Sequence, residues 1–367
     1  MPESLHRTPL FDLHVQFGGR MVPFAGWEMP VCFAGINDEH HHTRTACSVF
    51  DVSHMGRLKL TGDGCESFLN LVCTRDLKGA EAGRSYYSNI CREDGGILDD
   101  VIVSRFADRW GVVCNASNRE KILNWLRRHA EGKDVKIVDE TFSTAMVACQ
   151  GPRTIELARE VADTDLSSLG RYKFLVRELG PLQIITYRSG YTGEDGVEVV
   201  LPAVLANGLV GRLLGAPEQP HPTIKPAGLG SRDTLRLEAA MPLYGHELTE
   251  DVDSLTAGLD WCVDLNKDFI GAEPMRKLKA QGLRRVRVGL ELDGRRIARQ
   301  HAAVFAEDQP VGEVTSGTLS PTLGKSIAMA YVAAEQSVAG TELSVEVSGK
   351  RVASVVVKLP FYKRAKS

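Results

Sequence analysis

One stretch constrains the fold of this chain more than any other: Gly95–Val103, with the sequence GGILDDVIV. Two glycines predict a tight turn, and the apolar run after them predicts a strand buried on both faces. Two adjacent carboxylates, Asp99 and Asp100, interrupt that run. The local pattern leaves two interpretations open: aspartates that accept backbone N–H bonds in the turn, or one working acid in a pocket.

Side-chain alternation along the strand separates the two acids. Because successive side chains point to opposite faces, we expect one face to carry Ile97, Asp99, Val101 and Val103 and the other to carry Leu98, Asp100 and Ile102. The two acids then cannot share one pocket, so at most one of them is a working group.

The composition excludes several classes of function. With 367 residues, 43% hydrophobic and 25% charged, the chain has the composition of a globular protein with room for two or three domains. A net charge of −3 gives no global attraction to nucleic acid or to an anionic membrane. No uninterrupted apolar run reaches the roughly 18 residues of a membrane span. We expect a cytoplasmic protein, or a mature organellar one, that binds neither nucleic acid nor membrane.

The cysteines and histidines do not form a metal-binding pattern. The eight cysteines contain no C-x-x-C pair and mostly lie in apolar runs, which is typical of small core residues in a reducing compartment. The run His40–His42 places three side chains about 100° apart around a helix, so they cannot converge on one ion. We expect a solvated helix face there and no metal site.

The order of the expected elements predicts a mixed α+β chain. Helices are expected at about 36–45, 118–130 and 203–214, and strands at Trp110–Cys114 and Leu182–Tyr187. An α+β domain of residues 57–138 would be inserted between residues 1–56 and 139–275. Six short strands with Gly, Pro and Ser between them predict an all-β barrel or jelly roll for residues 285–367. The basic segment 276–299 could steer an acidic partner or be an ordinary solvated surface.

Lone polar groups in or beside apolar strands are the candidates for chemistry. The chain has no nucleophile elbow or phosphate-binding loop, and the glycines of 190–196 (GYTGEDG) fit a hairpin better than a dinucleotide site. Asp100, Asn115, Glu198 and Arg232 remain. Together they suit a planar, amide-rich heterocycle with a carboxylate tail, because an acid pairs with N–H donors and arginine grips a carboxylate.

An ordered set of motifs gives a resemblance to the folate-dependent aminomethyltransferase family, which includes the T protein of the glycine cleavage system. The resemblance runs almost end to end. It rests on FDVSHM (50–55), GGILDD (95–100), NASN (115–118), GYTGEDGVE (190–198), SRDTLRLE (231–238), PLYG (242–245), KDFIG (267–271), VTSG (314–317) and PFY (360–362).

The resemblance implies three domains in a ring, the last one a jelly-roll-like barrel, with tetrahydrofolate in the central hole. It also implies transfer of an aminomethyl group from a lipoyl arm of H protein to tetrahydrofolate, giving 5,10-methylenetetrahydrofolate and ammonia. H protein with its aminomethylated lipoyl-lysine is then the partner, and glycine dehydrogenase and dihydrolipoyl dehydrogenase are functional associates.

Residue by residue, the resemblance matches Asp100 to the aspartate beside the reacting folate nitrogens and Glu198 to the acid that holds the pterin edge. Arg232 and Tyr362 match further folate-site positions. Met55, Tyr87 and Asn115 match residues that line the pocket. Asp99 is left with a turn or surface hydrogen bond.

Two alternatives stay open at this point. One is a folate-binding repair protein without transferase activity, like the iron–sulfur repair relatives of the family. The other is the folate subunit of a demethylating oxidase, which would need a separate flavin subunit, since this chain has no G-x-G-x-x-G strand-turn-helix unit.

Overall fold

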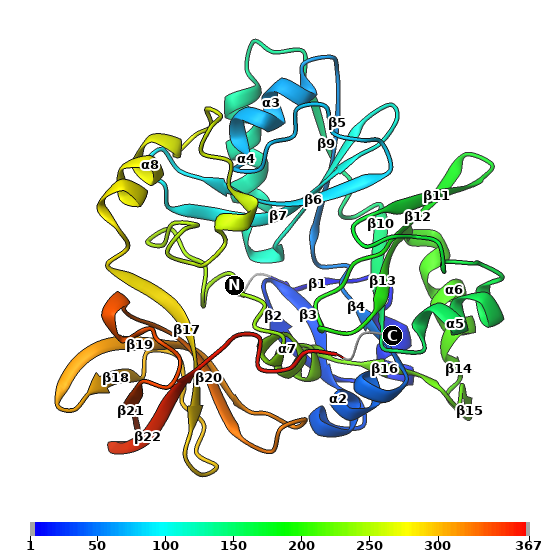
Figure 1. Ribbon diagram of the computed structural model, residues 1–367. Coiled ribbons are helices and arrows are strands. Elements are labelled where there is room, and N and C mark those ends of the chain that lie inside the picture. Colours follow the sequence, from blue (N-terminus) through cyan, green and yellow to red (C-terminus); the bar gives the residue numbers. More distant parts are fainter. Residues whose placement is uncertain (1–3, 365–367) are drawn as a thin grey trace.

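The computed structural model describes residues 4–364, so the outermost residues of the predicted ranges, 1–3 and 365–367, lie outside the described part. Three bodies sit around a common centre (Figure 1): a mixed sheet with helices, an antiparallel sheet with helices, and a closed barrel. The predicted α+β fold with a C-terminal β-barrel is confirmed.

The mixed sheet has the strand order β11-β12-β13-β10-β4-β16. Its strands are β4 (Cys47–Asp51), β10 (Thr144–Gln150), β11 (Phe174–Leu179), β12 (Leu182–Tyr187), β13 (Gly196–Pro202) and β16 (Ile224–Ala227). Alternation sends Val49 and Val147 into the core under α5 (Thr154–Ala162) and α6 (Ala203–Leu214). Phe50 and Met146 enter a second core on the opposite face.

Helix α2 (Ile36–Thr45) forms where the sequence predicts it and packs against α7 (Leu229–Glu238). The predicted solvated face of the histidine run is wrong for His40. Its side chain is fully buried, with Nδ1 2.7 Å from Thr234 Oγ1 and Nε2 2.8 Å from Thr322 Oγ1. The reason is tertiary: α7 and the loop after β19 cover the face of α2 that carries His40, whereas His41 remains exposed. Within residues 4–364, no group of His, Cys, Asp and Glu is arranged to hold a metal ion.

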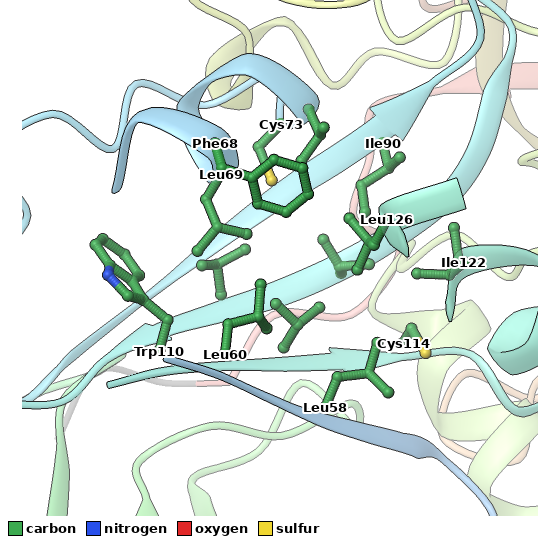
Figure 2. Packing of buried hydrophobic residues seen from close by; sticks show 14 of the residues in the cluster. Leu58, Leu60, Phe68, Leu69, Cys73, Ile90, Trp110, Cys114, Ile122 and Leu126 are labelled. Atoms are coloured by element: carbon green, nitrogen blue, oxygen red, sulfur yellow. The ribbon is translucent and has the colours of Figure 1, made fainter. Parts of the chain in front are cut away.

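The antiparallel sheet has the order β6-β7-β8-β5-β9. Its strands are β5 (Gly56–Thr61), β6 (Arg84–Cys91), β7 (Ile97–Arg105), β8 (Trp110–Cys114) and β9 (Lys136–Asp139). Helices α3 (Cys65–Val72) and α4 (Arg119–Ala130), the latter preceded by the short η1 (Ala116–Asn118), cover one face. Figure 2 shows Phe68 and Leu69 of α3 and Ile122 and Leu126 of α4 in the cluster that also contains Leu60 and Cys114. Ile270, from outside this segment, packs against the same core, and the insertion of about 57–138 stays a prediction.

A β-bulge shifts the side-chain alternation at the start of β7. On the neighbouring strand Ile90 pairs with Asp99 and Cys91 pairs with Ile97, so Leu98 is an extra residue. Leu98 therefore joins the core that contains Val101, whereas Ile97 joins a core on the other side of the sheet. The predicted faces of Ile97 and Leu98 are wrong for this reason.

Arg57 ties together the two chain segments that connect the antiparallel sheet to the mixed sheet. Its side chain is buried and donates to the carbonyl oxygens of Ser53 (3.0 Å) and Met55 (2.7 Å) on the outgoing segment. On the returning segment it donates to the carbonyl oxygen of Thr141 and to Thr144, at 2.7 Å from Oγ1 and 3.0 Å from the carbonyl oxygen. Burial lowers the pKa of Arg57 to about 10, so the guanidinium stays charged at neutral pH.

The C-terminal barrel closes in the order β17-β20-β19-β18-β21-β22. Its strands are β17 (Arg285–Leu292), β18 (Ala303–Ala306), β19 (Gln309–Leu319), β20 (Ser326–Ala333), β21 (Glu342–Val347) and β22 (Lys350–Val357), with η3 (Ala334–Gln336) after β20. Inward positions alternate along each strand, and small residues such as Ala328 and Ala330 fill the narrow interior beside Leu290 and Val345. The six predicted strands are confirmed.

The remaining elements are short. They are β1 (His6–Arg7), α1 (Phe11–Gln16), β2 (Arg20–Phe24), β3 (Trp27–Cys32), β14 (Gly215–Ala216), β15 (Gln219–Pro220), η2 (Asp260–Cys262) and α8 (Ala272–Gln281). All cysteines are free, and all but the partly buried Cys32 are buried, as expected of core residues. No helix within residues 4–364 has the length and apolarity to cross a membrane.

Candidate active site

A cavity of about 970 Å³ lies where the three bodies meet. Its wall includes Asp100 from β7, Glu198 from β13, Arg232 from α7 and Arg287 from β17. Aromatic side chains line it as well: Phe24, Tyr87, Tyr172, Tyr187, Tyr191, Tyr244 and Trp261. This volume is that of a site that encloses most of a drug-sized molecule.

Asp100 presents a carboxylate to the cavity with both oxygens held. Oδ2 accepts a hydrogen bond from the Tyr87 hydroxyl at 2.9 Å, and Oδ1 accepts one from Asn115 Nδ2 at 2.7 Å. Burial raises the pKa of Asp100, and the bonds from Tyr87 and Asn115 oppose that rise. Two of the predicted pocket residues thus orient the predicted catalytic acid.

Asp99 is buried rather than near the surface, which corrects the expected turn or surface role. Its carboxylate accepts from the Asn115 backbone N–H at 2.9 Å, from Asn115 Nδ2 at 2.8 Å and from Asn118 Nδ2 at 2.7 Å. The Asn115 amide therefore bridges both aspartates, although they lie on opposite faces of β7. Burial first, and the neighbouring charge of Asp100 second, raise the pKa of Asp99 to about 7.

Trp261, which no sequence pattern singled out, stacks on Tyr87. The two rings have centroids 5.2 Å apart at an interplanar angle of 25°, and Trp261 is 53% exposed. It lies in η2, a single 3₁₀ turn within a loop that has no periodicity, so nothing local indicated its position. Burial, and then the charge of Asp100, raise the pKa of Tyr87 well above its ordinary value, so its hydroxyl is a hydrogen-bond donor at neutral pH.

Glu198 and Arg232 lie on opposite elements of the wall and are linked through the 189–196 turn. Ser189 Oγ donates to Glu198 Oε2 at 2.6 Å. Tyr191 places its ring 4.7 Å from the Arg232 guanidinium carbon and donates its hydroxyl to the Pro242 carbonyl oxygen. Tyr191 is a second cavity-lining residue that sequence reasoning missed, although it lies within a quoted motif.

Three buried nitrogens on the cavity wall have no hydrogen-bond partner among the described residues: His54 Nδ1, Arg232 Nη1 and Arg287 Nε. Burial lowers the pKa of Arg232, opposed by the charge of Glu198, and burial lowers that of His54 to about 4, so His54 is neutral at pH 7. Unpaired buried donors are costly. The two arginine nitrogens are N–H donors, so a ligand whose acceptor or anionic groups reached them would satisfy them, which fits the expected carboxylate-bearing heterocycle.

The last two predicted residues differ in position. Met55 lines the cavity. Tyr362 is not among the lining residues; its backbone N–H donates to the Glu238 carbonyl oxygen at 2.8 Å, and its ring lies 3.9 Å from the Arg44 guanidinium carbon. A folate contact by Tyr362 stays a prediction.

Two family models match the chain. The GCVT N-terminal domain matches residues 10–267, and the glycine cleavage T-protein C-terminal barrel domain matches residues 285–363. Together they span both sheets and the barrel.

Full-length relatives are similar along the whole chain. An aminomethyltransferase from Rubrobacter xylanophilus is 45% identical over 366 residues, covering 99% of this chain and 96% of the relative. One from Bacillus cytotoxicus is 41% identical over 367 residues, covering 99% and 100%. The crystal structure of glycine cleavage system aminomethyltransferase T from Bartonella henselae superimposes with a TM-score of 0.92 at 34% identity, covering 98% of this chain and 99% of that one.

Proposed function

The chain belongs to the glycine cleavage T-protein family, and from that premise we propose that its central cavity is the site of aminomethyl transfer, with Asp100 as the acid at the reacting atoms. The protein is a tetrahydrofolate-dependent aminomethyltransferase. The observation that carries the site proposal is an oriented, partly desolvated carboxylate in a cavity that also holds an unpartnered arginine.

The reaction needs a group that stabilises a developing cation. The donor carries a sulfur–CH₂–NH₂ unit. One folate nitrogen displaces the thiol, and loss of ammonia from the resulting N–CH₂–NH₂ unit leaves an iminium-like carbon, which the second folate nitrogen attacks. The two protons released by the folate nitrogens go to ammonia and to the thiol, so the atoms balance. An Asp100 carboxylate can stabilise the cation and accept a proton from the attacking nitrogen.

The other residues bind and orient the folate. Glu198, held by Ser189, offers an acceptor to N–H donors of the pterin edge. Arg232, whose Nη1 has no partner within residues 4–364, offers a cation to an acceptor or carboxylate. Tyr87 and Asn115 hold Asp100, and Met55 adds an apolar surface.

The proposed donor is the aminomethylated lipoyl-lysine of H protein, within a system that includes glycine dehydrogenase and dihydrolipoyl dehydrogenase. Exposed arginines at 284 and 285 support a docking surface for an acidic carrier in the segment 276–299. Replacing both by glutamate should slow association at low salt. Lys350→Glu, an exposed change on the β21–β22 hairpin, serves as the control; equal slowing in both proteins would refute this surface.

The decisive experiment is folate-dependent ammonia release from aminomethylated H protein, with the melting temperature measured in parallel. Tetrahydrofolate should raise the melting temperature, because it binds only the folded protein. A chain that binds folate but releases no ammonia would be a repair-type binder. A chain that does neither would refute the assignment of the cavity.

A further inference from the structure

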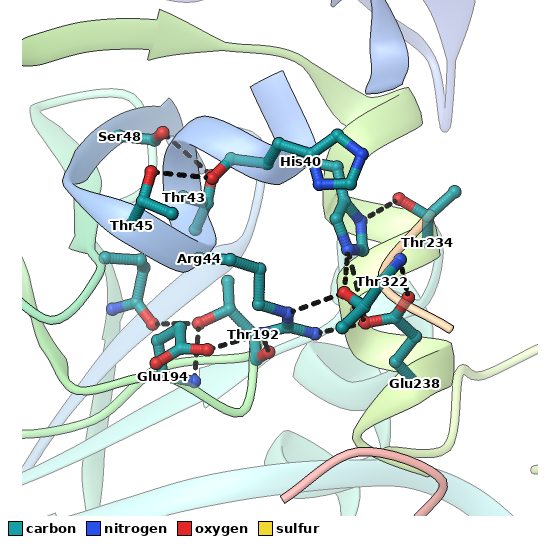
Figure 3. Close-up of polar contacts among 12 residues, drawn as sticks. His40, Thr43, Arg44, Thr45, Ser48, Thr192, Glu194, Thr234, Glu238 and Thr322 are labelled. Carbon is teal, nitrogen blue, oxygen red and sulfur yellow. Dashed lines mark hydrogen bonds and ion pairs between the residues drawn. The ribbon is translucent and has the colours of Figure 1, made fainter. Parts of the chain in front are cut away.

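A buried polar cluster lies outside the cavity, between α2, α7, the 189–196 turn and the barrel loop after β19. Figure 3 shows Arg44 at its centre, between Thr192 and Glu194 on one side and Glu238 and Thr322 on the other. Arg44 is not among the residues that line the cavity. Four chain segments distant in sequence therefore meet at one side chain.

The Arg44 guanidinium spans two separate acceptor sets. Nη1 donates to the Thr192 carbonyl oxygen at 2.7 Å and to Glu194 Oε1 at 2.9 Å. Nη2 donates to Glu238 Oε2 at 2.7 Å. The side chain is 6% exposed, and the ring of Tyr362 covers it. A planar, forked donor is the side chain that can make all three bonds at once.

Glu238 anchors the α7 side of the cluster. It is the last residue of α7, is fully buried, and accepts from Ser320 Oγ, from Thr322 N at 3.0 Å and from Thr322 Oγ1 at 2.7 Å. His40 Nε2 lies 3.2 Å from Glu238 Oε2. These partners hold the Glu238 carboxylate in place independently of Arg44.

The turn side of the cluster depends more on Arg44. Within the turn, Thr192 Oγ1 donates to Gln150 Oε1 at 2.9 Å, which ties it to the sheet. Toward α7 the turn makes packing contacts: the Tyr191 ring lies on Arg232, and at Gly193, which has φ +82°, a Cβ would lie 2.9 Å from Ala239 Cβ. Arg44 supplies the hydrogen bonds that hold Glu194 and the Thr192 carbonyl toward the end of α7.

The two segments that Arg44 joins, the 189–196 turn and α7, both carry residues that line or support the cavity. The turn contains Ser189, which bonds Glu198, and Tyr191, whose ring packs on Arg232. Helix α7 contains Arg232 itself. We propose that Arg44 is a positioning residue for the folate site, which sets the placement of Glu198 and Tyr191 relative to Arg232 by tying the 189–196 turn to the end of α7. This inference rests on the proposed function of the cavity.

The test compares Arg44→Lys with wild type and with Arg109→Lys. Lysine keeps the charge but, with one ammonium group, cannot bridge both acceptor sets. Arg109 is a matched control because it is 14% exposed, bonds Asp108 and Gln183, stacks on Phe106 and does not line the cavity. The measurements are the calorimetric Kd for tetrahydrofolate, KM and kcat for ammonia release, and the melting temperature.

Arg44→Lys should raise Kd and KM for tetrahydrofolate about tenfold while kcat at saturating folate stays within about threefold. Arg109→Lys should lower only the melting temperature. If Arg44→Lys does not fold, Glu194→Gln is used as the test variant and should also raise Kd for tetrahydrofolate. Unchanged Kd and KM in the folded variant would overturn the positioning role, whereas absence of folate binding by the wild type would refute the proposed function itself.

Discussion

Replacing Asp100 by asparagine removes one charge from the cavity and preserves its shape. The amide oxygen can still accept from Asn115 Nδ2, and the amide nitrogen can donate to the Tyr87 oxygen after the hydroxyl rotates. Folate binding should therefore survive, with Kd within about threefold. Loss of the charge that faces the iminium-like carbon should lower kcat by about 10²–10³-fold.

The same substitution should stabilise the protein at alkaline pH. Burial raises the pKa of Asp100, and burial and the Asp100 charge raise that of Asp99 to about 7. The folded state then holds more protons than the unfolded state between about pH 4 and 7, so wild-type stability falls as the pH rises through this range. Without one of the two charges, the variant should be more stable than wild type at pH 8 by on the order of 1–3 kcal/mol, and this difference should be smaller at pH 5.

Two assays check this reasoning: ammonia release at saturating tetrahydrofolate, and urea denaturation at pH 5 and pH 8. Asp94→Asn is the control, because Asp94 is an exposed acid in the turn before the same strand and should leave kcat unchanged. A fall in kcat of less than about tenfold would refute the role of the charge. An Asp100→Asn protein less stable than wild type at pH 8 would refute the electrostatic argument.

Three further outcomes follow from buried groups. Asp99→Asn should lower the free energy of unfolding by about 2–3 kcal/mol, measured in urea, because the amide nitrogen that replaces one carboxylate oxygen cannot accept the hydrogen bonds that Asn115 or Asn118 donates to that position. Glu238 has its pKa lowered to about 2, since bonds and charge from His40 and its other partners outweigh burial. Its stabilisation is present above about pH 4.5 and is lost as the pH falls toward 2, so Glu238→Gln should flatten the acid limb of stability, followed by circular dichroism. Leu126→Ala should cost about 2–5 kcal/mol in urea and leave kcat unchanged.

Local pattern was sufficient where one period runs through a whole element. Strand Trp110–Cys114 and helix Ala203–Leu214 have the predicted bounds, and the barrel strands follow from alternation between turn residues. Each of these elements buries a regular face against its own neighbours. Nothing distant in sequence has to be known to place them.

The start of β7 could not be predicted in this way, because distant chain segments shape it. The Ile97 N–H donates to the Val252 carbonyl oxygen at 3.0 Å, and a Cβ on Gly96 would lie 2.0 Å from the Glu250 carbonyl oxygen. The segment that contains Glu250 and Val252 therefore accounts for the bulge and for the burial of Asp99 next to it. Alternation alone carries no information about residues 150 positions away.

The residues of the candidate site likewise fall into those that local motifs predicted and those that depend on distant segments. Quoted motifs contained Asp100, Asn115, Glu198 and Arg232, all of which line one cavity. No sequence pattern indicated Trp261, and the burial of His40 depends on Thr234 and Thr322, which are remote in the chain. Such residues become visible only when the packing of α2, α7 and the barrel loop is known.

The Arg57 contacts have a mechanical consequence for how substrates enter and leave. A hinge needs a few residues free to change their backbone angles, yet carbonyl oxygens of both connecting segments accept hydrogen bonds from one buried guanidinium. An outward rotation of that sheet would break these hydrogen bonds, and because the Arg57 guanidinium is buried, water could not replace them. Exchange of folate should therefore proceed by rotation of side chains at the mouth, such as Trp261, with the width of the cavity held constant through the catalytic cycle.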